Sequence, residues 1–140
     1  MAICTDVYPN ILYSSVSAFA GNTVGLEINE KKERFRIPGI TGSLVAFTIQ
    51  GDSMAPTIKS GDMVICSALS SLADIKENEV YAIVSEEFVW VKRLQLVKGK
   101  SGTILQLKLI SDNHLEYDPF SIEVGRIKKV LKVKLKLTGI

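Results

Sequence analysis

Short runs of alternating apolar and polar residues, each bounded by turn signals, make up most of the chain. A period of two places successive side chains on opposite faces, which is typical of a β-strand that is buried on one side. The gaps between the runs are rich in Gly, Pro, Ser and Asp, which favour turns. The runs that predict strands are RFRIPG (34–39), SLVAFTIQ (43–50), SGDMVICSA (60–68), EVYAIVS (79–85), EFVWVKRLQLV (87–97), TILQLKLIS (103–111) and GRIKKVLKVKLKL (125–137).

Helical periodicity is weak and is confined to the stretches SMAPTIK and SLADIKE. The sequence therefore predicts a mainly β fold, in which several short sheets curl around one core. In the C-terminal run, Lys132, Lys134 and Lys136 alternate with aliphatic residues. This alternation favours an amphipathic strand with one solvated face over a basic patch for nucleic acid, because strand lysines also discourage edge-to-edge aggregation.

The composition is that of one globular domain. The chain has 140 residues, of which 46% are hydrophobic and 23% are charged, so there is enough apolar material for a core. The formal net charge of +2 is too small to indicate a nucleic-acid partner by itself. No apolar run approaches the ~18 residues that span a bilayer, and we therefore expect no membrane segment.

Cysteine and histidine are scarce in the chain. Cys4 and Cys66 are far apart in sequence and match no spacing of a metal or redox site. We therefore expect two free thiols in a reducing compartment, and hence a cytoplasmic protein. Because His114 is the single histidine, we expect no metal site and no cofactor.

The stretch VSAFAGNTVG (16–25) has the small-x-small pattern that precedes the cleavage site of secretory signal peptides. However, no basic residue occurs before Lys31, so the basic region of a signal peptide is missing. Ala20-Gly21 is then either a plain turn or a cleavage site for another protease, which includes this protein itself.

The segment IQGDSMAPTIKSGDMVI (49–65) is the first candidate for chemistry, because a predicted strand runs directly into a Gly-Asp-Ser turn. A serine at the mouth of such a turn can expose its hydroxyl, and the backbone N–H groups around it can stabilise an oxyanion. The alternative is that Ser53 is an ordinary turn residue.

A nucleophilic serine needs a base, and Lys92 is the better candidate. On a strand, Phe88, Trp90 and Lys92 project to the same side, and loss of hydration there lowers a lysine pKa. A lysine that is neutral near pH 7 can take the proton of a serine. The alternative is a solvated lysine whose stem lies over Trp90. His114 is expected on the surface, and Arg93 points to the opposite face and is no usable base.

Taken together, GDSMAPTIKSGDMVI and the later VKRL, whose lysine lies 39 positions after the serine (92 − 53), resemble the LexA, phage repressor and UmuD family of self-cleaving serine peptidases. The resemblance covers the chain from about Val16 onward and implies the fold that LexA shares with type I signal peptidases. It implies a catalytic dyad of Ser53 as nucleophile and Lys92 as general base. It further implies an oxyanion hole from the backbone N–H groups of Asp52 and Ser53, and an active-site turn shaped by Gly51, Met54, Pro56, Gly61 and Asp62.

The resemblance also suggests a role for Ala20-Gly21, because members of this family cut their own chain at an Ala-Gly or Cys-Gly bond upstream of the serine. The pair lies 33 positions before Ser53 (53 − 20). We therefore divide the chain into an N-terminal arm or linker (1–25) with the cleavage site and a peptidase and dimerisation domain (26–140). The alternative is that the bond is never cut.

Several functions are compatible with this resemblance. The first is the peptidase domain of a transcriptional repressor, which cuts itself in the DNA-damage response with a RecA filament as co-inducer and so relieves repression. DNA would then be bound only through an N-terminal domain that this chain lacks. The second is a UmuD-type accessory subunit of an error-prone DNA polymerase, and the third is a dimerisation module that does not cleave. A processing peptidase for secreted precursors would normally need a membrane anchor. A homodimer is expected throughout, with the C-terminal strand as a candidate surface.

Overall fold

The computed structural model describes residues 9–14 and 33–140, and these residues form a β protein. Its strands are β1 (Ile11–Tyr13), β2 (Glu33–Phe35), β3 (Leu44–Thr48), β4 (Met63–Ala68), β5 (Val80–Ser85), β6 (Val89–Lys98), β7 (Ile104–Ile110), β8 (Phe120–Glu123) and β9 (Ile127–Leu137). Two short 3₁₀ helices complete the described elements, η2 (Leu72–Asp74) and η3 (Val124–Arg126). The prediction of a mainly β fold is confirmed, and β2–β7 and β9 overlap the predicted runs, whereas β1 and β8 were not predicted.

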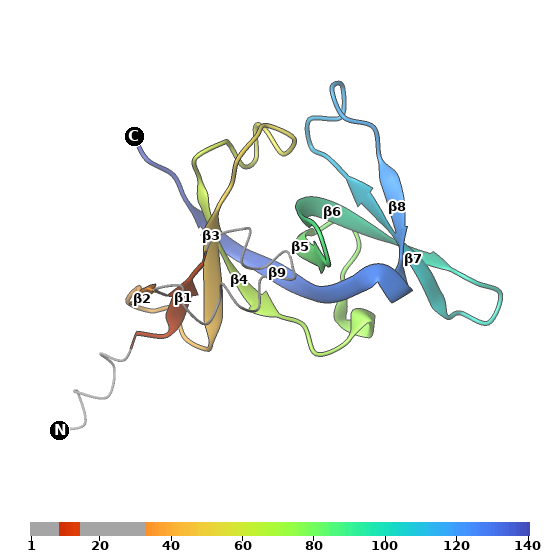
Figure 1. Cartoon of the computed structure of the whole chain (residues 1–140), viewed down its shortest axis with the longest axis horizontal. Helices are drawn as coiled ribbons and strands as arrows, with labels where there is room; N and C mark the ends of the chain where they lie inside the picture. Colours follow the sequence, from red (N-terminus) through yellow and green to blue (C-terminus); the bar gives the residue numbers. More distant parts are fainter. Residues whose placement is uncertain (1–8, 15–32) are drawn as a thin grey trace.

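All the described strands belong to one nine-stranded sheet with the order β2-β1-β3-β4-β9-β5-β6-β7-β8. Only β1 and β3 pair in parallel, and the other neighbours are antiparallel. The long strand β9 connects two halves, because its first part pairs with β5 and its second part pairs with β4. Figure 1 shows β9 running from the half that contains β5–β8 to the half that contains β1–β4.

The position of β9 bears on the predicted dimer surface. Each edge of this strand is paired over only part of its length, because residues 127–132 pair with β5 on one edge and residues 131–137 pair with β4 on the other. Lys134 and Lys136 are exposed, whereas Val133 and Leu135 are half-buried. The predicted amphipathic strand is therefore present, while a dimer through it stays a prediction.

The core consists of several clusters, one of which spans both halves of the sheet. One cluster, which includes Phe47, Val64 and Leu131, packs between β3, β4, β5 and β9. Another, which includes Tyr81 and Leu107, lies under β5–β8. Each cluster buries side chains from several strands, and burial of each large apolar side chain contributes about 1.5–3 kcal/mol.

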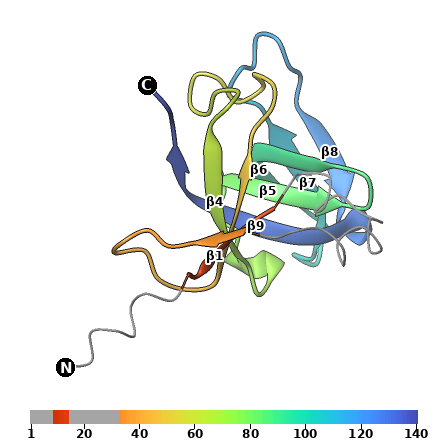
Figure 2. The same cartoon turned by 60° about the vertical axis from the view of Figure 1, so that its left-hand side comes forward.

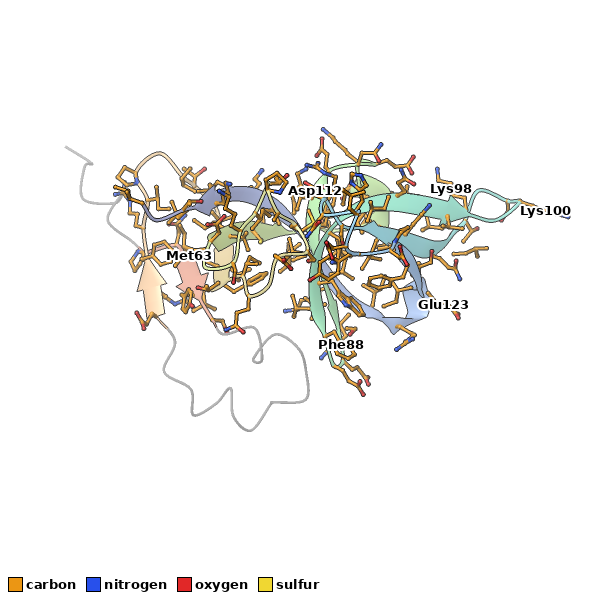
Figure 3. All side chains as sticks on the ribbon, turned by 90° about the horizontal axis from the view of Figure 1, so that it is seen from above. Met63, Phe88, Lys98, Lys100, Asp112 and Glu123 are labelled. Atoms are coloured by element: carbon orange, nitrogen blue, oxygen red, sulfur yellow. The ribbon has the colours of Figure 1, made fainter. Side chains whose placement is uncertain are left out.

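Two loops lie at the same end of the molecule, the turn that joins β3 to β4 and the connection from β7 to β8. Figures 1 and 2 show both at the top, although they come from different halves of the sheet. Figure 3 looks down on this end and places Asp112, in the second loop, between the two halves. The fold therefore brings residues near positions 53 and 112 to one place.

Candidate active site

The turn between β3 and β4 contains Ser53. Gly51 and Gly61 stand near its two ends with φ angles of 97° and 96°, a backbone region that glycine adopts without steric cost. Backbone hydrogen bonds close the turn: Gly61 N donates to Ile49 O at 2.8 Å, and Ile49 N donates to Asp62 O at 2.8 Å. The turn is therefore fixed at its base and carries Ser53 in a half-buried position.

Apolar side chains anchor the same turn to the core. Met54 and Ile58 are buried in the cluster between β3, β4, β5 and β9, and Ile58 N donates to Met54 O at 2.9 Å. The peptide bond between Ala55 and Pro56 is cis. Met54 also accepts a hydrogen bond on its sulfur from Asp112 N, at 3.4 Å. The residue after Ser53 is thus held by the core on one side and by the second loop on the other.

Asp62 holds the end of the turn, in agreement with the structural place that the sequence suggested for it. It is 3% exposed, and its Oδ2 accepts a hydrogen bond from Lys59 N at 2.9 Å. This backbone hydrogen bond is the main reason that the pKa of Asp62 lies below its usual range, although burial opposes the shift. Lys136 Nζ lies 3.8 Å from Asp62 Oδ2 and donates to Thr57 O at 2.5 Å, which ties the turn to β9.

Lys92 is buried on β6, with 6% of its surface exposed. Its Nζ donates a hydrogen bond to Ser111 Oγ at 2.8 Å and lies 5.6 Å from the centre of the Tyr117 ring. Burial lowers the pKa of Lys92, because the charged form loses hydration. The alternative of a solvated strand lysine is therefore wrong, and burial shifts the amine toward its neutral form.

The aromatic residue beside Lys92 differs from the one that the sequence suggested. Phe88 and Trp90 stack on each other with ring centres 5.4 Å apart, and Trp90 meets Phe120 edge-on at 5.5 Å. Phe88 is 51% exposed and points away from the body of the sheet in Figure 3. A ring that faces the Lys92 amine is that of Tyr117, which belongs to the β7–β8 connection.

Ser53 and Lys92 meet the same segment, residues 111–117. Asn113 N donates to Ser53 O at 3.0 Å, and Asn113 Nδ2 donates to Asp52 O at 3.2 Å. Tyr117 connects the turn that contains Ser53 with Lys92. Its hydroxyl donates to Asp52 Oδ1 at 2.6 Å, and its ring faces the Lys92 amine. The structure therefore brings Ser53 and Lys92 to one loop, although they stand on different halves of the sheet.

The polar groups that a nucleophilic serine needs are available in this turn. Among residues 9–14 and 33–140, the Ser53 hydroxyl and the backbone N–H groups of Asp52 and Ser53 have no hydrogen-bond partner. A free hydroxyl can be approached by a base, and free N–H groups can receive a developing oxyanion.

An ion pair locks the second loop in place. Arg93 Nε donates to Asp112 Oδ1 at 2.7 Å, and Arg93 Nη2 donates to Asp112 Oδ2 at 3.1 Å. The Thr57 hydroxyl also donates to Asp112 Oδ2. Burial disfavours the charge of Asp112, but the hydrogen bonds from Arg93 and Thr57 outweigh it and hold the pKa of this carboxyl below its usual range. Two neighbours on β6, Lys92 and Arg93, thus bind the two residues that follow β7, Ser111 and Asp112.

Sequence reasoning considered the segment SDNHLEY only for His114 and missed its other residues. His114 is exposed, as expected. The missed residues are Ser111, Asp112, Asn113 and Tyr117, which make the contacts described above. The register that brings them to Lys92 is visible only in the structure, where β7 pairs with β6 and Ile110 lies opposite Arg93. A polar run directly after that strand is therefore carried next to Lys92.

Other chemistry finds little support in the described part of the chain. No group of three or more His, Cys, Asp or Glu residues there is arranged to hold a metal ion. Cys66 is a buried free cysteine, and burial raises the pKa of its thiol to about 12, which disfavours the reactive thiolate. None of the helices among these residues has the length and apolar character to cross a membrane. Ala20 and Gly21 lie outside the described residues, as does the proposed boundary at residue 25.

Comparison with known proteins gives two findings. A family model described as Peptidase S24-like matches residues 11–133, which is most of the chain. A protein of Haemophilus influenzae named "Uncharacterized HTH-type transcriptional regulator" is 36% identical over 76 residues. The matched segment covers 54% of the present chain but only 28% of the relative. The relative is therefore much longer than the segment that it shares with this chain.

Proposed function

Because the chain belongs to the Peptidase S24-like family, we propose that it is a serine peptidase domain that cuts its own chain between Ala20 and Gly21. The observation that carries this proposal is that the Ser53 turn and the buried Lys92 meet on one loop. A buried, hydrogen-bonded lysine with a lowered pKa is the kind of base that a serine needs in a protein without a suitable histidine.

The proposed reaction has two steps. Neutral Lys92 takes the proton of the Ser53 hydroxyl while the oxygen attacks the carbonyl carbon of Ala20. The backbone N–H groups of Asp52 and Ser53 stabilise the oxyanion of the tetrahedral intermediate. Lys92 then gives the proton to the amine of Gly21, which leaves, and water hydrolyses the ester on Ser53. Because the substrate belongs to the same chain, its effective concentration is high and a weak catalyst is sufficient.

We further propose that this cleavage controls a transcriptional repressor. The support is the relative, which carries the name of an HTH-type transcriptional regulator and is much longer than its matching segment. In such a protein, a cut upstream of the peptidase domain separates it from the DNA-binding part and relieves repression. Activation by a RecA filament after DNA damage and pairing into a homodimer belong to the same proposal. The name of the relative favours this function over that of a polymerase subunit.

The test is an intact-mass measurement on the purified protein. We expect loss of the first 20 residues. The cleavage rate should rise from pH 7 to about pH 10, because a higher pH increases the neutral fraction of Lys92. Ser53→Ala and Lys92→Ala should abolish the reaction, whereas Lys129→Ala, which removes an exposed lysine of β9, should leave it unchanged. An intact mass at every pH, also with an activated RecA filament added, would contradict self-cleavage and favour a dimerisation module.

A further inference from the structure

Ser111 is a buried polar residue that the proposed reaction does not use. It is 3% exposed and stands directly after β7, where the chain leaves the sheet. Its hydroxyl oxygen accepts the hydrogen bond of Lys92 Nζ at 2.8 Å. Buried polar groups without partners are costly, so each member of this pair satisfies the other. Because one member is the candidate base, the hydrogen bond can also affect the reaction.

We propose that Ser111 is a positioning residue that orients the amine of Lys92 toward the hydroxyl of Ser53. This inference rests on the proposed function, because it assigns a role in the same self-cleavage reaction. In this role Ser111 binds neither the substrate nor the nucleophile and acts only through its hydrogen bond with Lys92.

A neutral amine has two N–H groups and one lone pair. Only the lone pair can accept a proton, so a base works when this lone pair faces the serine hydroxyl. Free rotation about the last carbon–nitrogen bond of Lys92 would spread it over several directions. The bond to Ser111 fixes one N–H, and the Tyr117 ring limits the space on another side. One direction is thereby left for the lone pair.

The backbone around Ser111 couples this orientation to the nucleophile. Two residues later, Asn113 N donates to Ser53 O at 3.0 Å. Between them, Asp112 is held by two hydrogen bonds from Arg93, the neighbour of Lys92 on β6. Residues 111, 112 and 113 therefore bind, in this order, the base, its neighbour on β6 and the backbone of the nucleophile. Such a short connection sets the distance between base and nucleophile with little freedom, which is what a proton transfer requires.

The pH dependence of cleavage distinguishes a positioning role of Ser111 from a purely structural one. The hydroxyl oxygen binds the charged ammonium more strongly than the neutral amine, because charge-assisted hydrogen bonds are the stronger ones. Removal of the oxygen should therefore lower the pKa of Lys92 further and move the midpoint of the pH–rate profile to lower pH. The plateau rate at high pH should fall at the same time, because the amine is neutral but no longer oriented. A structural role would reduce the folded fraction and leave both parameters of the folded protein unchanged.

The experiment compares the full chain with three variants, by intact mass from about pH 6 to about pH 11, with rates corrected for the folded fraction by circular dichroism. Ser111→Ala removes the hydroxyl, and Ser111→Thr retains it. Ser85→Ala is the matched control, because Ser85 is also buried, at 5% exposure, but hydrogen-bonds with Phe88 in the β5–β6 turn. The expected result for Ser111→Ala is a plateau rate reduced about tenfold, less than the ~10²–10⁴-fold contribution of a general base, and a lower midpoint. Ser111→Thr should restore both, and Ser85→Ala should change neither.

The outcomes separate the two proposals. A wild-type protein that cleaves itself while Ser111→Ala keeps its plateau and midpoint refutes the role of Ser111 alone. A wild-type protein that never cleaves refutes the proposed function, and the catalytic role of Ser111 with it. Titration of carbon-13-labelled lysine by NMR, in the Ser53→Ala background, measures the pKa of Lys92 without any cleavage. An unchanged pKa in the Ser111→Ala variant would show that the hydrogen bond does not govern the amine, which overturns the inference.

Discussion

The ion pair between Arg93 and Asp112 provides the sharpest test of how the site is held together. Asp112 receives two hydrogen bonds from Arg93, at 2.7 and 3.1 Å, and one from Thr57. The substitution Asp112→Asn keeps the size of the side chain and one acceptor oxygen but removes the charge. It therefore weakens the connection between β6, the β3–β4 turn and the loop that contacts both Ser53 and Lys92.

The size of the effect follows from burial. The Asp112 side chain is 13% exposed and that of Arg93 is 35% exposed, so the pair is neither a surface pair nor a fully buried one. Exposed ion pairs contribute about 0–1 kcal/mol, and hydrogen bonds to charged groups contribute about 1.5–3 kcal/mol. We expect Asp112→Asn to lower the free energy of unfolding by about 1–2 kcal/mol at pH 7. Arg93→Gln should cost more, about 2–3 kcal/mol, because it leaves the more buried charge unpaired.

Urea denaturation of the wild type, both single variants and the double variant measures these values and the coupling between the two residues. The pH dependence gives a second check. Because the folded pKa of Asp112 is lowered, its contribution is present above the unfolded value of ~3.9 and is lost as the pH falls through the folded pKa. The difference between wild type and Asp112→Asn should therefore shrink below about pH 3.9. A coupling energy near zero, or a difference that does not depend on pH, would refute the reasoning.

Three further predictions concern single residues of the turn and the core. Gly61→Ala should lower the free energy of unfolding by about 1–2 kcal/mol in urea titrations, because φ is 96° while an added Cβ meets no atom within 4 Å; no loss would contradict this. Met54→Ala should cost about 2–5 kcal/mol by the same measurement and slow self-cleavage, because it leaves a cavity beneath Ser53; an unchanged stability would exclude a packing role. Cys66 should resist a thiol reagent at pH 8 until the protein unfolds, since burial raises the pKa of its thiol to about 12; peptide mapping by mass checks this, and rapid labelling of the native protein would contradict it.

The sequence predicted the elements of the fold better than their arrangement. Long alternating runs such as residues 87–97 predicted strands that the structure contains, because a period of two is a local signal. The three-residue strand β1 (Ile11–Tyr13) was not predicted, since so short a segment has almost no pattern. Its parallel pairing with β3 and the place of β9 between β4 and β5 depend on contacts distant in sequence. Such contacts leave no trace in the local periodicity.

The same distinction applies to the site. Ser53 and Lys92 were predicted from their motif and from the spacing of apolar residues around them. The loop that joins them was missed, because a serine after a strand is ordinary in sequence and becomes informative only when the register places it beside Lys92. The Tyr117 ring that faces the Lys92 amine was missed as well, since alternation along β6 cannot reveal a tyrosine that arrives from the β7–β8 connection.

The division of the sheet has a consequence for how the proposed reaction depends on the fold. Ser53 follows β3 in one half, whereas Lys92 stands on β6 in the other, and the halves are joined by β9, by the loop contacts and by the core cluster that contains Met54. A small rotation of one half against the other would separate base from nucleophile, and the core cluster that spans β3, β4, β5 and β9 opposes it from below. The contacts of Ser111, Asp112 and Asn113 resist that rotation directly, because they lie between the two groups. Their loss should therefore reduce cleavage more than it reduces stability, which distinguishes them from the buried residues of the core.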